Sequence, residues 1–93
     1  MQDLSIEDFT SWLGEGCRVA SGDLLLEMTL EQAQPLEGGV REAGAFRLEF
    51  LGPSRPVLPQ GVMTVERAAC AYEIFLVPTS IDATGSRYEA VFY

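Results

Sequence analysis

The side chains that could take part in chemistry here are two cysteines and a few carboxylates. Cys17 and Cys70 are far apart in sequence and lack the Cys-x-x-Cys spacing of a zinc or redox motif. Glu66, Glu73 and Glu89 lie in late segments of alternating polarity, where two of them could flank a glycosidic bond. Glycoside hydrolysis also needs a cleft that admits a sugar, which a domain of 93 residues rarely offers. We therefore expect no catalytic site among them.

The segment Asp82-Ala-Thr-Gly85 resembles the start of a calcium-binding loop. It lacks the further alternating oxygen ligands that such a loop needs, so we expect a hairpin turn instead. Two thiols without histidine make a poor zinc site. We expect no metal and no cofactor. The sequence leaves open whether Cys17 and Cys70 are bridged, although two reduced thiols suit a cytoplasmic protein better.

Three residue types are missing from the chain: His, Lys and Asn. Without His, the chain lacks the side chain whose unperturbed pKa lies nearest neutrality and which most often acts as general base. Without Lys, it can form neither a Schiff base nor a Walker-type phosphate contact. These absences predict that the protein is not an enzyme.

The chain is acidic, with 14 acids, 6 bases and a net charge of −8. All the bases are arginines, and they are scattered rather than clustered, which disfavours nucleic acid and anionic membranes as partners. The acidity can serve solubility or attract a basic partner protein. No apolar run approaches the ~20 residues that span a bilayer, and the N-terminus does not resemble a signal peptide, so we expect a cytoplasmic protein.

One helix is predicted near the N-terminus, beginning at Ser5, whose hydroxyl could cap it, and ending before Gly14. Its apolar residues recur at helical spacing and are Ile6, Phe9, Trp12 and Leu13. This stripe either covers the open side of a β core or forms an exposed binding surface; we expect the former.

The rest of the chain alternates with a period of two, which is typical of half-buried strands. In the first long segment, Leu24, Leu26, Met28 and Leu30 face one way, and Pro35 should end the strand. Residues 37–44 should form a mobile loop. Pro78 should likewise end a later strand. The expected strands cover residues 17–20, 24–34, 45–51, 61–67, 72–77 and 87–93.

Every link between strands is too short for a helical crossover, so the sheet should be antiparallel. We predict a single domain over residues 1–93, mainly β (α+β): a compact antiparallel β-barrel or roll of about six strands with one short N-terminal helix. Within it, Arg47 should lie beside Glu27 or Glu31 on a neighbouring strand.

Residues 51–61, LGPSRPVLPQG, contain three prolines and two glycines. Proline lacks an N–H donor and has a fixed φ, so the middle of this segment cannot join a sheet ladder. It should be an ordered connection between strands. It either crosses the end of the barrel or displays a rigid recognition loop.

Several ordered motifs in the chain resemble a small bacterial domain family of unknown function with the pattern GP…LPQG…FLVP…YEAVF. They are Gly52-Pro53, Leu58 to Gly61, Glu73 to Pro78 and Tyr88 to Phe92, preceded by the helix from Leu4 to Leu13. The chain departs from the pattern between residues 62 and 71, where Met63 replaces an expected aromatic residue and Ala68 to Ala71 replace a longer polar hairpin. The resemblance implies no catalytic residues.

These observations favour a non-enzymatic structural or protein-interaction module, acting through a protein partner or self-association. The resemblance further implies a subunit or accessory of a larger, phage-tail-like assembly. The expected contact surface consists of Leu51, Arg55, Val57 and Tyr93, with the outward-facing Leu25 beside them. The alternative is a small-ligand-binding β-barrel, whose interior would be lined by Leu26, Met28, Phe46, Leu48, Phe50 and Phe75.

Overall fold

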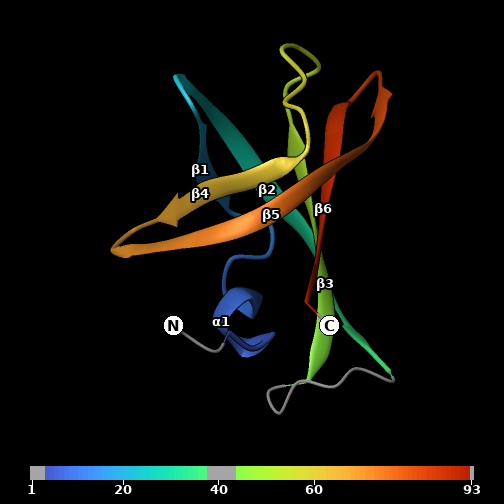
Figure 1. Ribbon diagram of the computed structural model, residues 1–93. Helices are drawn as coiled ribbons and strands as arrows, with labels where there is room; N and C mark the ends of the chain where they lie inside the picture. Colours follow the sequence, from blue (N-terminus) through green and yellow to red (C-terminus); the bar gives the residue numbers. More distant parts are fainter. Residues whose placement is uncertain (1–3, 38–43, 93) are drawn as a thin grey trace.

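A computed structural model describes residues 4–37 and 44–92 of the chain and shows one short helix and six strands (Figure 1). The elements, in chain order, are α1 (Glu7–Thr10), β1 (Gly16–Ser21), β2 (Leu24–Leu36), β3 (Ala45–Gly52), β4 (Gly61–Arg67), β5 (Cys70–Asp82) and β6 (Gly85–Phe92). The predicted strand segments and the short N-terminal helix are thus confirmed. In the described residues, no helix is long and apolar enough to cross a membrane.

The strands form a single closed sheet in the order β1-β2-β3-β6-β5-β4, with β4 pairing back to β1. Every pair is antiparallel, as predicted. In this order β3 and β4 lie on opposite sides of the ring. The connection between them, residues 53–60, must therefore cross the end of the barrel. This was the first of the two alternatives predicted for the proline-rich segment.

Alternating apolar residues from all six strands fill the interior. Met28, Leu30, Leu48 and Phe50 are almost completely buried, as the alternation predicted. Phe75 does not belong to this set, because 51% of it is exposed on the outer face of β5. The pattern of β5 places Ile74 and Leu76 inside instead.

The helix closes one end of the barrel. Phe9 is fully buried, and its ring contacts Trp12, Phe46, Tyr72 and Phe92, with ring centroids 5.2–6.1 Å apart. The helix therefore covers the core, as expected, rather than presenting a binding stripe. Two details of the prediction are wrong. Leu13 is 41% exposed, and the Ser5 hydroxyl does not cap the helix; instead, the Ser5 N–H donates to the Asp8 carboxylate over 2.8 Å.

The prediction that Pro35 and Pro78 end their strands is also wrong. β2 continues through Pro35 to Leu36, and β5 continues through Pro78 to Asp82. Both prolines lie where a long strand extends beyond its shorter neighbour: β1 pairs with β2 only as far as Thr29, and β4 pairs with β5 only as far as Leu76. One side of each strand is then an edge, where a missing N–H breaks no ladder hydrogen bond.

A β-bulge lies near each of these prolines, between Leu30 and Gln32 and between Pro78 and Ser80. A bulge inserts one residue and so reverses which residues point inward. In β2, even-numbered residues face the core up to Leu30, whereas Ala33 packs against it after the bulge. Most of the predicted mobile loop after β2, residues 38–43, lies outside the described residues.

The predicted hairpin turn at Asp82 is confirmed. The Asp82 carboxylate accepts hydrogen bonds from the backbone N–H groups of Thr84, over 2.8 Å, and Gly85, over 3.3 Å. The Thr84 bond is the largest of several contacts that lower the pKa of Asp82. Its carboxylate therefore stabilises the turn.

Candidate functional site

The end of the barrel opposite α1 carries the proline-rich connection, which we call the proline loop (residues 53–60), between the β1–β2 and β5–β6 hairpins (Figure 1). Leu58 anchors this loop, because its side chain is fully buried and its N–H donates to the Tyr88 hydroxyl over 2.8 Å inside the barrel. A second contact joins the Ser86 hydroxyl to the Ser54 carbonyl over 3.5 Å. The loop is thus a fixed lid whose outer residues face solvent.

A hollow of about 310 Å³ lies between the proline loop and the far half of β5. Its walls are Val57 from the loop and Pro78, Thr79, Ser80 and Ile81 from the strand. Val57 is 38% exposed and Ile81 is 61% exposed, so apolar side chains border the opening. This hollow includes a predicted contact residue, Val57, and adds a segment of β5 that was not expected to belong to a strand.

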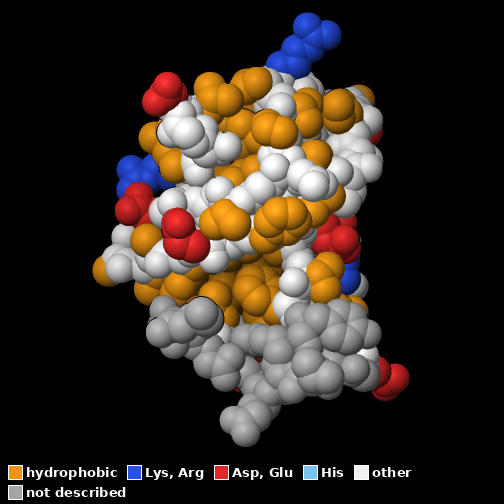
Figure 2. Space-filling view, viewed as in Figure 1, with side chains coloured by type: hydrophobic (Ala, Val, Ile, Leu, Met, Phe, Trp, Pro, Cys, Tyr) orange, Lys and Arg blue, Asp and Glu red, His pale blue; other side chains and the backbone are white. Residues whose placement is uncertain are grey.

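Exposed apolar residues gather around this site. Leu24 and Leu25, 45% and 62% exposed, lie in β2 at the same end of the barrel. Along the neighbouring face, Val62 of β4 and Phe75 of β5 are cross-strand partners that are 63% and 51% exposed. Figure 2 shows hydrophobic side chains spread over the β4–β5 face and up to the proline-loop end, with acidic groups mostly at the margins. Exposed apolar residues that gather on one face mark interaction sites more often than residues scattered singly do.

The predicted contact residues have different positions. Arg55 is exposed on the proline loop, two residues before Val57, and is not itself part of the lining of the hollow. Leu51 is half-buried in β3, and a Cβ on Gly85 would lie 3.2 Å from its Cδ1, so it faces the β5–β6 hairpin. Leu25 is exposed at the same end, as expected. Tyr93 lies outside the described residues.

Arg55 differs from the other arginines of the described ranges in its surroundings. Each of the others has a carboxylate within ion-pair distance; the pairs are Arg18–Glu66, Arg47–Glu89, Arg67–Glu15 and Arg87–Glu31. Arg55 has no such partner among residues 4–37 and 44–92. In a chain with 14 acids and 6 bases, an exposed guanidinium without a carboxylate neighbour is free to meet one from outside.

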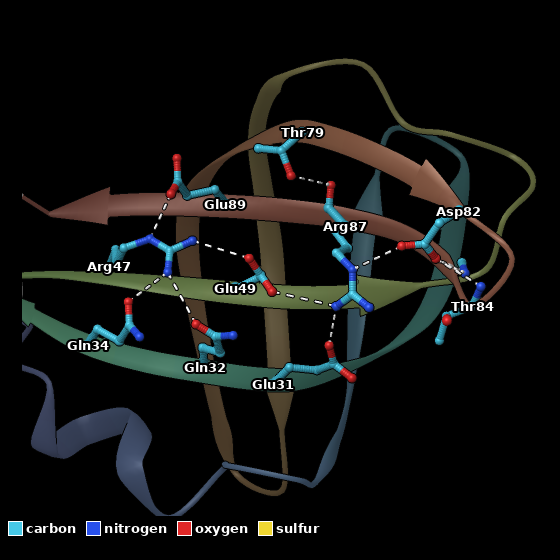
Figure 3. Close-up of polar contacts among 11 residues, drawn as sticks. Glu31, Gln32, Gln34, Arg47, Glu49, Thr79, Asp82, Thr84, Arg87 and Glu89 are labelled. Atoms are coloured by element: carbon cyan, nitrogen blue, oxygen red, sulfur yellow. Dashed lines mark hydrogen bonds and ion pairs between the residues drawn. The ribbon is translucent and has the colours of Figure 1, made fainter.

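A half-buried polar network covers the outer face of β2, β3 and β6 (Figure 3). Arg47 donates to Glu89 over 2.7 Å and to Gln34 over 2.9 Å, and the Glu89 hydrogen bond is the main cause of its raised pKa. Arg87 binds Glu31, and its pKa is raised chiefly by that hydrogen bond. The network links three strands through side chains that already form hydrogen bonds and ion pairs with one another.

The expectation that Arg47 lies beside Glu27 or Glu31 is therefore wrong. The register of β2 and β3 places Gln34, and not a glutamate, opposite Arg47. Glu31 instead reaches Arg87 of β6, and Glu27 is opposite Arg18 of β1. The physical reason is the overall register of the sheet, which places Glu31 three positions before Gln34 and pairs Glu27 with β1.

The structure does not bring the three candidate carboxylates together. Glu66 pairs with Arg18, Glu73 accepts a hydrogen bond from the Thr64 hydroxyl, and Glu89 pairs with Arg47 on a different part of the sheet. Within the described ranges, no group of three or more His, Cys, Asp or Glu side chains is arranged to hold a metal ion.

A second hollow, of about 300 Å³, lies near the α1 end of β1 and β4. Its lining includes Cys17, Glu27 and Arg67. The Arg67 guanidinium contacts Glu15 over 3.1 Å, whereas its Nε atom is buried without a hydrogen-bond partner. The charged residues of its lining are two arginines, Arg18 and Arg67, and two glutamates, Glu27 and Glu66, so the hollow favours neither an anion nor a cation.

Cys17 and Cys70 are both free thiols, which answers the open question of a bridge. Cys17 is buried, and burial, reinforced by Glu27 and opposed by Arg67, raises the pKa of its thiol to about 11. Cys70 is exposed at the start of β5. The two thiols should therefore differ sharply in reactivity.

We expect a thiol reagent such as DTNB to modify one cysteine of the native protein at pH 8 and both in denaturant. Only the thiolate reacts, and Cys17 combines a high pKa with exclusion from solvent. Absorbance of the released thiolate measures the stoichiometry, with Cys70→Ser as the variant that should lose the rapid reaction. Rapid modification of native Cys70→Ser would contradict the buried position of Cys17.

Comparison with known proteins gives a family but no further relative. No curated protein and no solved structure matches the chain. A family described as a domain of unknown function (DUF6916) matches residues 4–92, which end with β6. The match includes α1, all six strands and the proline loop. The chain belongs to this domain family of unknown function, DUF6916.

Proposed function

We propose that this protein is a non-enzymatic protein-interaction module whose contact face is the proline-loop end of the barrel. The observation that supports this most is the apolar hollow between Val57 and the far half of β5, bordered by exposed Ile81. The adjoining Val62–Phe75 pair extends the apolar surface along the β4–β5 face. A module of this kind fits an accessory subunit of a larger, phage-tail-like assembly.

The chemistry of the chain supports a binding role over a catalytic one. Its carboxylates near Arg18 and Arg47 are neutralised by ion pairs, and its buried thiol has a pKa of about 11, so it is not a ready nucleophile. Two free thiols suit a bacterial cytoplasm, which is the compartment we propose. The small-ligand-binding alternative has no specific observation in its favour, since the core positions are occupied by the chain's own side chains.

We expect Val57→Asp to weaken partner binding at least about tenfold, because a carboxylate in the hollow must be desolvated when a partner covers it. Tagged wild type and variant would be compared by affinity purification from native bacterial lysate, with bound proteins quantified by mass spectrometry. Light scattering of the purified protein would test self-association in parallel.

Val91→Asp is a matched control for this variant. Val91 is 50% exposed on the outer face of β6, away from the hollow, and the substitution adds the same charge. It should retain the partners that Val57→Asp loses, while circular dichroism shows both variants folded. Equal retention of every partner by the two variants would exclude the proline-loop end as the contact face.

A further inference from the structure

The far half of β5 has a free backbone edge. β4 begins at Gly61, which is opposite Leu76, so the residues of β5 from Val77 to Asp82 pair with β6 on one side. On the other side, no strand of the described ranges is paired with them. The two polar anchors of the proline loop described above reach Tyr88 and Ser86 of β6 rather than this edge. A free strand edge is a common binding place for an extended peptide.

The hollow beside this edge is small for a ligand site and mostly apolar. Its volume of about 310 Å³ is at the lower end of the range of ~300–1,000 Å³ found for ligand sites. Val57, Pro78 and Ile81 supply apolar walls, and the Thr79 hydroxyl is already bonded to the Arg87 carbonyl. The hollow therefore suits one large apolar side chain better than a polar cofactor.

Pro78 and the bulge at Thr79 limit how a partner strand can pair with the free edge of β5. Both features interrupt a regular ladder and protect natural edges against unlimited pairing. A short segment that is held mainly by one inserted side chain is compatible with them, whereas a long partner strand is not.

Arg55 indicates the charge of such a segment. It is exposed two residues before Val57 and has no ion-pair partner among the described residues, although acids outnumber bases in the chain. A carboxylate that follows the apolar side chain of the partner could form a charge-assisted hydrogen bond with this guanidinium. A carboxylate of the partner placed elsewhere on this surface would instead be repelled by the chain's net charge of −8.

We propose that the β5 edge at Thr79–Ile81 binds a short extended segment of a partner protein, which inserts one large apolar side chain into the Val57 hollow and places a neighbouring carboxylate against Arg55. This inference rests on the proposed function and specifies the chemistry of its partner. It is independent of which protein carries the segment.

A selection from a displayed library of random heptapeptides tests the proposal. The wild-type protein should enrich peptides in which a large apolar residue is adjacent to Asp or Glu. Arg55→Glu should replace that preference by Lys or Arg at the same position, because the charge that faces the peptide is reversed. Ile81→Asp should abolish enrichment, since it places a carboxylate at the mouth of the hollow.

The affinity of one selected peptide gives the second measurement. Fluorescence anisotropy should show binding at least fivefold weaker to Arg55→Glu. Arg18→Glu is the matched control, since Arg18 is exposed on β1 and pairs with Glu66; it should bind within twofold of wild type. Amide shifts on peptide addition should be largest at Thr79, Ser80 and Ile81 in a ¹H–¹⁵N spectrum.

Three results would overturn the proposal. They are wild-type enrichment no greater than that of Ile81→Asp, a peptide preference that Arg55→Glu leaves unchanged, and a self-association that Val57→Asp abolishes, which would make a second copy the occupant. If no peptide is enriched but partner capture still depends on Val57, only this inference fails. If capture is also independent of Val57, the proposed function fails with it.

Discussion

Phe9→Ala is expected to lower the free energy of unfolding by about 4 kcal/mol, within the ~3–5 kcal/mol typical of deleting a fully buried phenylalanine ring. The ring is completely buried and contacts aromatic residues of β3, β5 and β6. Domains of this size have a total stability of only ~5–15 kcal/mol, so the variant should be close to unfolding at 37 °C. Urea titration followed by circular dichroism measures the change.

Leu13→Ala is the control for this prediction. Leu13 belongs to the same apolar stripe in the sequence but is 41% exposed, so its truncation should cost below about 1 kcal/mol. A loss of less than about 1 kcal/mol for Phe9→Ala would show that the helix does not close the barrel. The contrast separates a helix that covers the core from one that displays a binding stripe.

The helix is needed because the sheet is incomplete beside it. β5 pairs with β6 only from Val77 onward, so the first half of β5 and the last residues of β6 are not joined by a ladder. Phe9 lies between Tyr72 of β5 and Phe92 of β6 and fills this gap with ring contacts. The sequence predicted the apolar stripe of the helix, but not the gap, since pairing between distant strands leaves no local pattern.

Alternation was a good predictor wherever a strand has neighbours on both sides. It placed Leu48 and Phe50 in the core and Arg47 and Glu49 outside, as the structure has them. The expectation that Pro35 and Pro78 end their strands failed, because whether a proline ends a strand depends on the length of the neighbouring strand. That length is a property of the whole sheet and cannot be read within a short window of sequence.

The same failure hid half of the candidate site. Arg55 and Val57 could be predicted, because a proline-rich connection holds its exposed residues in place. Thr79, Ser80 and Ile81 were left out of the strand that Pro78 was expected to end, although their β-branched and hydroxyl side chains are compatible with a strand. The site arises only because β5 extends beyond its paired segment with β4, so that the free edge of β5 lies beside the proline loop.

Gly85→Ala is expected to destabilise the protein by about 4 kcal/mol, from backbone strain of ~1–3 kcal/mol and overpacking of similar size. Gly85 has a φ of +147°, and a Cβ built there would lie 2.2 Å from the Gly52 carbonyl oxygen. Gly52 cannot retreat easily, because it is paired across the sheet with Ser86. A variant that accumulates unfolded agrees with this expectation, and urea titration measures one that folds.

Gly61→Ala provides the matched control. Gly61 begins β4 at the other end of the proline loop, and nothing lies within 4 Å of a Cβ built on it. Its replacement should change stability by no more than about 0.5 kcal/mol. The two glycines thus test whether the loop is fixed at its β3 side, where Gly52 and Gly85 are in close contact. If Gly85→Ala cost less than about 1 kcal/mol, this corner would be able to move, and Val57 would not be held opposite Pro78 and Ile81 as a preformed hollow requires.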